Sequence, residues 1–262
     1  MIPRLVILCG LLFVLSGIVS GCDPAYRYMF FPPERTEYTL APDPNLLFST
    51  SDTSYYVTRD SLSVVFDRKT FKVEIKYFSD YQLNTLEFPD DSRDAEFSAN
   101  PFTFANWIDP QLGYAPNRFT VFKISIFNYA SSKLNFDPEL SFLVTDRGDV
   151  LSGYGREEKS SRNQSIEGYF RTRKGSSGVD DEVFERRMGI VRQTVLYLGR
   201  PIFQGDSREG IVVYDALDES VDKVKLIMKG FITAYNENNE PSEFLDLQFY
   251  FTRVPLQKDR FQ

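Results

Sequence analysis

The sequence predicts a mainly β protein, an antiparallel sandwich of about seven or eight strands with a helical insertion. Short apolar segments recur along the chain with turn residues between them, and they do not alternate with helices as in a βαβ protein. One stretch near 160–198 has helical spacing instead of strand spacing. The 24 Phe and 15 Tyr residues supply the large side chains that the core of such a sandwich needs.

The chain begins with an apolar leader. Arg4 gives a positive start, and Leu5–Val19 is almost wholly apolar. This run has about 15 residues, as in a signal peptide, whereas a helix that spans a membrane needs roughly 20. The small residues Ser20 and Gly21 follow the run directly. We therefore predict a signal peptide at 1–21 that is removed from the mature protein.

The end of the leader, Val19-Ser20-Gly21-Cys22, resembles the lipobox of bacterial lipoproteins. That resemblance implies diacylation of the Cys22 thiol and cleavage before it, and two or more acyl chains hold a protein stably at a membrane. We expect a lipid anchor on Cys22 in the bacterial cell envelope, with the domain outside the cytoplasm. Asp23 resembles the inner-membrane retention signal of enterobacterial lipoproteins and slightly favours that membrane. The alternative is an ordinary secretory leader followed by a chance cysteine.

The composition excludes several classes of function. The net charge is −7 and no long basic run occurs, so we expect no nucleic-acid partner. The sequence has no His, which excludes triads built on His and zinc sites of the Cys/His type. Of the two Cys residues, Cys9 leaves with the leader and Cys22 is acylated, so the mature domain has no disulfide. We expect no metal, no cofactor and no catalytic residue.

The prolines define the expected domain boundaries. Five of them lie between 22 and 52 with little periodicity around them, which predicts a proline-rich tether over 22–52. The β-sandwich domain is then expected over 53–254, and a short tail over 255–262.

The clearest strand is Phe71–Phe78, where apolar residues alternate with Lys and Glu. A period of two places one face in the core and the other in water. In the last strand the odd positions Leu247, Phe249 and Phe251 are expected to face the core. The expected strands are Ser61–Phe66, Phe71–Phe78, Phe119–Phe127, Leu140–Val144, Val150–Leu151, Ile211–Tyr214, Val224–Ile232 and Phe244–Phe251.

The insertion near 160–198 predicts a short helix at Ile166–Phe170 and a longer one after it. Phe184, Met188, Val191 and Val195 follow the spacing of one helical face. We expect this face to pack onto the core, with a partner-binding face as the alternative.

A long polar connection spans Asn84–Asn117. Connections of this length are usually functional or packed by their own side chains. We expect Phe102, Phe104 and Trp107 to close an open end of the sandwich, with a ligand-binding aromatic cluster as the alternative. Two acidic groups lack the alternating spacing of a calcium loop and are expected to be solvated. They are Asp90, Asp91, Asp94 and Glu96, and Asp215, Asp218, Glu219 and Asp222.

Four loose motifs occur between Phe122 and Tyr214: Phe122–Asn128, Asp137-Pro138, Asp146-Arg147-Gly148 and Gly210–Tyr214. In these motifs the domain resembles the immunoglobulin-like domains of small secreted or lipid-anchored bacterial proteins, such as the immunoprotective extracellular domains of mycobacterial antigens. The resemblance implies an immunoglobulin-like sandwich, from which the helical stretch departs as an insertion.

Two functions follow as hypotheses. The first is a lipid-anchored cell-envelope protein that acts as a non-enzymatic interaction or structural module with an envelope protein as partner. The second is a carbohydrate-directed binding protein or hydrolase that uses the aromatic and acidic loop 84–117, with Trp107 and Tyr114 as its aromatic residues.

Overall fold

The computed structural model describes residues 37–47, 53–157, 164–197 and 200–258. The expected signal peptide, Cys22 and Asp23 lie outside these ranges. None of the helices in the described ranges combines the length and the apolar character needed to cross a membrane. Residues 37–106 and 117–262 form one compact unit that holds every named strand, and the turn at Trp107–Pro116 belongs to a second unit that is described by itself.

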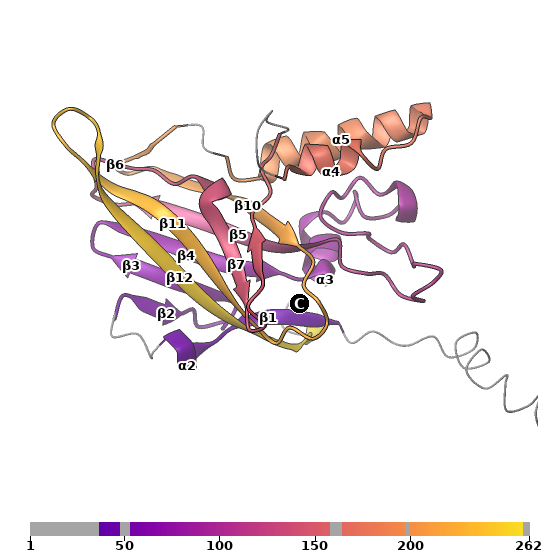
Figure 1. The fold of residues 1–262 in the computed structure, drawn as a ribbon, viewed down its shortest axis with the longest axis horizontal. Helices are drawn as coiled ribbons and strands as arrows, with labels where there is room; N and C mark the ends of the chain where they lie inside the picture. The colour runs from indigo at the N-terminus through magenta and orange to yellow at the C-terminus, as the bar shows by residue number, and fades with distance from the viewer. Residues whose placement is uncertain (1–36, 48–52, 158–163, 198–199, 259–262) are drawn as a thin grey trace, which may run out of the picture. The chain divides into compact units, whose positions relative to one another are not determined.

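The protein is mainly β, as predicted, and its two main sheets have five strands each (Figure 1). All neighbouring strands in both sheets are antiparallel. Sheet A has the order β1-β12-β11-β7-β8, and sheet B has the order β10-β5-β4-β3-β2. In sheet A the bounds are β1 Tyr38–Pro42, β7 Ser141–Thr145, β8 Val150–Ser152, β11 Lys223–Tyr235 and β12 Pro241–Pro255. In sheet B they are β2 Tyr55–Val57, β3 Ser63–Arg68, β4 Phe71–Phe78, β5 Phe119–Asn128 and β10 Ser207–Asp215.

The other elements are short apart from one helix. Strands β6 and β9 form a two-stranded pair that links the connection after β5 to the connection before β10. Helix α5 is the longest of the described helices, with 17 residues. The bounds are β6 Lys133–Leu134, β9 Ile202–Phe203, α2 Pro44–Leu47, α3 Asp80–Gln82, α4 Ile166–Arg171, α5 Gly178–Thr194, a π-helical turn η1 at Leu83–Glu87, and 3-10 turns η2 at Ala95–Phe97 and η3 at Pro138–Leu140.

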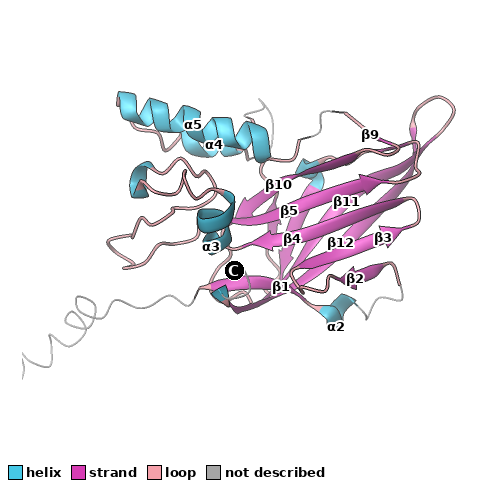
Figure 2. Cartoon of the chain, turned by 180° about the vertical axis from the view of Figure 1, so that it is seen from behind, coloured by secondary structure: helices cyan, strands magenta, loops and turns pink. Residues whose placement is uncertain are grey.

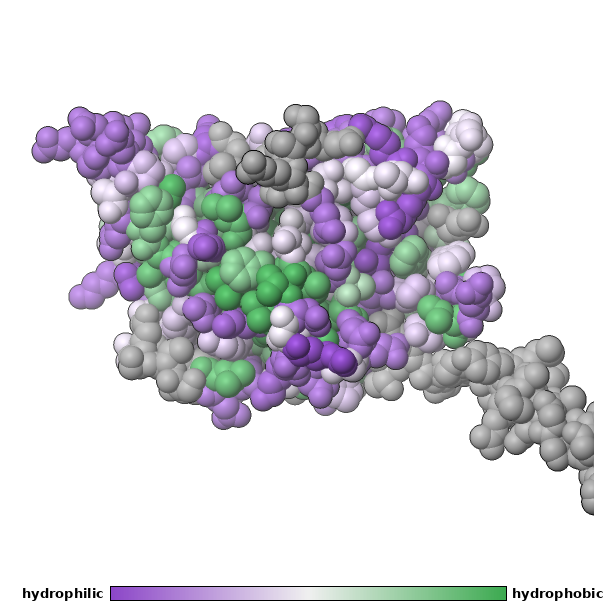
Figure 3. Space-filling view, viewed as in Figure 1, coloured by the Kyte–Doolittle hydropathy of each residue, from purple (hydrophilic) through white to green (hydrophobic). Residues whose placement is uncertain are grey.

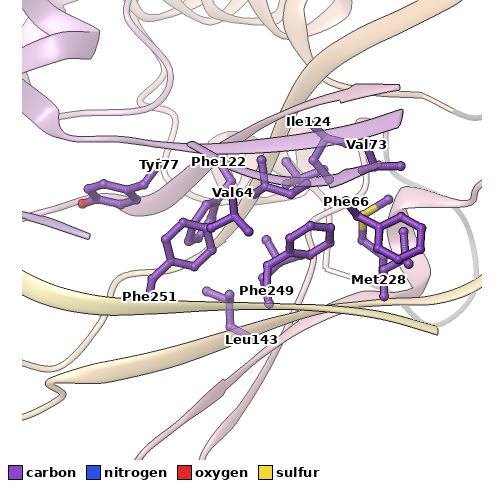
Figure 4. Packing of buried hydrophobic residues seen from close by; sticks show 14 of the residues in the cluster. Val64, Phe66, Val73, Tyr77, Phe122, Ile124, Leu143, Met228, Phe249 and Phe251 are labelled. Atoms are coloured by element: carbon purple, nitrogen blue, oxygen red, sulfur yellow. The ribbon is translucent and has the colours of Figure 1, made fainter. Parts of the chain in front are cut away.

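The main core lies between the two sheets (Figure 4). Phe71, Val73, Ile75 and Tyr77 of β4 are buried there, and the charged residues between them are partly exposed, as the period of two predicts. The predicted alternation in β12 is also confirmed, because its odd positions from Leu247 to Phe251 are buried.

A second core lies at one end of the outer face of sheet B. Helices α4 and α5 lie beside this end, close to the end of β10 (Figure 2). There Met188 and Val191 of α5 pack with Val121 of β5 and Val213 of β10. The prediction that this helical face packs onto the core is confirmed, because Val195 is buried in the same core and Phe184 is partly buried against it. Sheet B is therefore buried on both faces where β5 begins and β10 ends.

The outer face of sheet A is open in Figure 3, where an apolar patch lies at its centre. The strand register places Phe142, Val144 and Ile227 on this face, since their neighbours Leu143 and Leu226 point into the core. All three are half-buried. Antiparallel sheets commonly have one such face in water.

The expected tether differs from the structure in one part. Residues Tyr38–Pro42, expected within the tether, form β1, in which Tyr38 and Leu40 reach the main core. The dense prolines obscured this period of two, and Pro42 is tolerated because it ends a strand at the sheet edge. The immunoglobulin-like order is not confirmed, since the first strand β1 pairs with the last strand β12.

Candidate functional site

The most unusual polar group in the described part of the chain is the guanidinium of Arg118. Arg118 directly precedes β5 and is only 8% exposed. Its Nε and Nη1 atoms are buried and have no hydrogen-bond partner among the described residues. A buried charge without an acceptor costs several kcal/mol, so native structures rarely keep one without a reason.

Two aromatic rings hold this guanidinium in place. The Cζ atom of Arg118 lies 4.2 Å from the centroid of the Phe104 ring and 5.1 Å from that of Phe170. Each such contact contributes roughly 0.5–2 kcal/mol, depending on how far the site is desolvated. The rings therefore stabilise the cation without providing conventional acceptors for its N–H groups.

Two further arginines lie nearby, Arg187 over the Phe170 ring that Arg118 also contacts and Arg173 over the neighbouring ring of Tyr169. The Cζ atom of Arg187, on α5, lies 5.0 Å from the Phe170 centroid, and that of Arg173 lies 3.9 Å from the Tyr169 centroid. Arg173 is exposed and Arg187 is half-buried, so positive charge continues from the surface toward Arg118. We call Arg118, Arg173 and Arg187 the arginine cluster.

The pKa of Arg118 is lowered to about 9, mainly by burial and to a smaller extent by repulsion from Arg187. Asp80 and Tyr169 act in the opposite direction. Burial likewise lowers the pKa of Arg187. At neutral pH the guanidinium of Arg118 is still charged, because this pH is below its lowered pKa.

A tyrosine and a carboxylate lie on the same side of sheet B. The hydroxyl of Tyr154 donates to Oδ1 of Asp215 at 2.7 Å, and its ring contacts those of Phe119 and Tyr169 at 5.2 and 6.4 Å. Burial raises the pKa of Tyr154 above its ordinary value, and the hydrogen bond to Asp215 adds to this. Tyr154 is therefore a proton donor in this pair at neutral pH.

Local structure explains why these side chains meet. Oδ1 of Asn84 accepts hydrogen bonds from Ser92, Asn100 and Thr103 at 3.2, 3.1 and 2.6 Å, which folds the connection back on itself and positions Phe104. Ser165 caps α4, the helix that carries Phe170.

Helix α5, which carries Arg187, is fixed at its start and along its length. The Ser177–Asp180 capping box begins α5. Nε of Arg187 donates to the Ser98 carbonyl at 2.9 Å, which ties α5 to the connection before β5.

The aromatic residues expected at the open end have different positions. Phe102 is fully buried in the second core, 5.5 Å from the Phe88 ring, whereas Phe104 lies over Arg118. Trp107 and Tyr114 are half-buried in the separate turn unit, where the Asp109 amide donates to the Tyr114 carbonyl at 3.1 Å. Their use in a carbohydrate site stays a prediction.

The two acidic groups are engaged in local contacts. Asp90 pairs with Arg93 at 2.5 Å, and Asp91 lies 3.6 Å from Arg186. Asp218 accepts from the Ser220 amide at 2.9 Å. Within the described ranges, no group of three or more Cys, Asp or Glu side chains is placed to hold a metal ion.

A cavity of about 280 Å³ lies at another place in the same unit, beside β1 and the end of β12. Its described lining includes Leu40, Tyr77, Gln82 and Val254 and carries no charged side chain. Gln82 is already used in the capping box with Ser79. We therefore regard the arginine cluster as the better candidate site.

Sequence reasoning missed Arg118 and Arg187. The only related signal in the sequence is the basic run Arg171–Lys174, whose composition is typical of a solvated connection. Two of its four residues form ion pairs in the structure: Arg171 with Glu167 at 2.5 Å, and Lys174 with Asp181.

Comparisons with known proteins leave the site without a described counterpart. No family model and no curated protein matches the chain. The solved structure of the yjhA protein from Bacillus subtilis is 10% identical, with 50% of this chain and 73% of that chain covered and a TM-score of 0.26. A functionally unknown protein from Listeria monocytogenes EGD-e is 11% identical, with coverages of 86% and 87% and a TM-score of 0.27. These likenesses are weak and carry no argument about function.

Proposed function

We propose that this chain is a lipid-anchored protein of the bacterial cell envelope that acts as a non-enzymatic interaction module. In this proposal Cys22 attaches the chain to a membrane, the inner one being slightly favoured by Asp23, and the arginine cluster binds an anionic group of an envelope partner. The leader and Val19-Ser20-Gly21-Cys22 support the anchor.

The observation that supports the binding role is the unsatisfied guanidinium of Arg118. Neither packing nor folding needs a cation at this place, because Met or Leu would fill the space between the rings of Phe104 and Phe170 without a desolvation cost. Groups that reduce stability in this way concentrate at sites of binding and catalysis. The groups in direct contact with the Arg118 guanidinium are the rings of Phe104 and Phe170, which are neither nucleophiles nor bases, and this favours binding over catalysis.

The finer fold class, an immunoglobulin-like sandwich, is part of this proposal as a hypothesis. What supports it is the pair of packed antiparallel sheets and the motifs of β5 and β10. The pairing of the last strand β12 with β1 counts against it, because the sheets of an immunoglobulin domain group the last strand with the third and the sixth. An experimental structure with the same pairing would overturn this hypothesis.

The anchor is tested by growing bacteria that express the chain with an alkyne-labelled fatty acid. We expect label on the native protein and its recovery with membranes, and loss of both in Cys22→Ala. Cys9→Ala is the matched control, since it removes the other thiol of the leader and should keep the label. An unlabelled native protein would overturn the anchor.

The binding role is tested separately, by mild crosslinking in cells followed by purification of the chain. We expect a reproducible envelope partner with the native protein and its loss with Arg118→Met. Failure to recover any such partner, or equal recovery with the variant, would contradict the assignment of the binding site.

A further inference from the structure

The donors of Arg118 need acceptors that the described residues do not provide. Its Nε and Nη1 groups are buried and unpaired, and the rings of Phe104 and Phe170 offer no conventional acceptor. An ordered ion is one of the explanations for a buried polar group of this kind. The described residues provide no acceptor for these two donors, which makes a bound ion the ligand to test for.

The charge around Arg118 indicates which ion fits. Arg187 and Arg173 repel Arg118 electrostatically, and Asp80 is the one carboxylate among its strongest charged neighbours. Three guanidinium groups against one carboxylate leave an excess of positive charge that a single carboxylate ligand would not neutralise. Inorganic phosphate and phosphate monoesters have up to two negative charges, and a phosphodiester head group has one. All of them offer several oxygens in the geometry that the donors of Arg match, so Arg is the side chain best suited to bind them.

Resting on the proposed function, we infer that the arginine cluster binds a phosphate group, carried by a soluble molecule or by a lipid head group. Arg118 supplies the buried donors, and Arg187 and Arg173 attract the anion from the surface inward. The rest of the chain has a net negative charge, so general attraction to anions does not explain such binding.

The test is isothermal titration calorimetry of the full chain in neutral detergent, with inorganic phosphate, glycerol phosphate and acetate at one ionic strength. We expect phosphate to bind at least about tenfold more tightly than acetate, and Arg118→Met to weaken phosphate binding at least about tenfold. Arg192→Met is the matched control, because Arg192 is exposed on α5 and pairs with Glu185. It should bind phosphate as the native protein does.

A second variant guards against misfolding of the first. Arg173 is exposed, so Arg173→Gln should fold normally and weaken phosphate binding by about two- to fivefold. Circular dichroism checks the fold of each variant.

Native mass spectrometry with phosphatidylglycerol or phosphatidylcholine then distinguishes a lipid head group from a soluble phosphate as the ligand. Retention of phosphatidylglycerol that is lost in Arg118→Met assigns a lipid head group, and phosphate binding without retained lipid assigns a soluble phosphate.

Two results would overturn the inference. Equal affinity for phosphate and acetate would refute the phosphate class but leave an anion-binding module in place. Absence of measurable binding by the native protein, with Arg118 satisfied by water only, would refute the site itself, whereas acylation of Cys22 is decided by the separate labelling experiment.

Discussion

The two sheets contribute differently to the protein. Sheet A is buried on one face and open on the other, where Figure 3 shows an apolar patch. Sheet B has the main core on one side and, where β5 begins and β10 ends, the helical layer on the other. The unsatisfied cation belongs to the second side of sheet B, where Arg118 precedes β5. The main core is apolar and serves stability, and the helical layer combines apolar packing with a charged group that stability does not need.

This difference indicates where the fold tolerates a costly group. A cation in the main core would disrupt the contact between both sheets, whereas a cation at the margin of the second core affects only one layer. Binding sites that reduce stability are expected at such places. The following predictions compare the two regions.

The largest effect is expected in the main core. Phe249→Ala removes a fully buried ring that lies 5.7 Å from the Tyr55 ring, and it should lower the free energy of unfolding by about 3–5 kcal/mol. Met188→Ala in the helical layer should cost about 2–3 kcal/mol. Phe244→Ala is the matched control on the same strand, because Phe244 is 60% exposed and should change little. Urea denaturation measures all three, and an equal loss for Phe249→Ala and Met188→Ala would contradict the ranking of the two cores.

The next effect concerns the contact between sheet B and the chain that follows α5. A Cβ at Gly210 would lie 2.7 Å from the backbone N and Cα of Leu196, and the Leu196 amide donates to the Ile211 carbonyl at 2.8 Å. Backbone cannot move away cheaply, so Gly210→Ala should cost about 2–3 kcal/mol.

Gly189→Ala on α5 is the opposite control. Nothing lies within 4 Å of the Cβ it would add, and alanine favours a helix over glycine by about 1 kcal/mol. Thermal unfolding should show a lowered Tm for Gly210→Ala and a raised Tm for Gly189→Ala. A Gly210→Ala variant of unchanged Tm would show that the helical layer is not held closely against β10.

The helical layer should gain stability when its cation is removed. Arg118→Met keeps an apolar side chain against Phe104 and Phe170 and removes the buried charge, so it should raise the free energy of unfolding by about 1–2 kcal/mol in phosphate-free buffer. Arg253→Met is the matched contrast. Arg253 also lies over a ring, that of Tyr38 at 4.1 Å, but it donates to two carbonyls at 2.8 Å, so its loss should destabilise. Destabilisation by Arg118→Met would show that its N–H groups are satisfied in the folded protein.

The sequence predicts the elements that depend on local patterns and misses the site that depends on tertiary structure. The period of β4 and the helical face of α5 are local patterns, and both are observed. The site is not local, because Arg118 is buried by Phe104 from one connection and Phe170 from α4. A lone arginine before a strand gives no signal of its burial, so the site required the tertiary structure. β1 was missed for another reason, since dense prolines hid a strand that pairs only with the end of the chain.

The smallest effect is expected at the start of α5, and it depends on pH. The Ser177 hydroxyl and amide both donate to Asp180, at 2.6 and 3.0 Å, and the hydroxyl is the main cause that lowers the pKa of Asp180. A carboxylate with a lowered native pKa stabilises the folded state above its ordinary pKa, and this contribution disappears as the pH falls through the lowered value. Ser177→Ala should therefore destabilise the protein near pH 7, and its difference from the native protein should shrink on acidification below about pH 4. Ser79→Ala is the control, because Ser79 forms its capping box with the uncharged Gln82, and its cost should not depend on pH. Denaturation followed by far-UV circular dichroism measures the free energy of unfolding of both variants across this pH range. An equal change of the two values with acid would contradict a role for the Asp180 carboxylate.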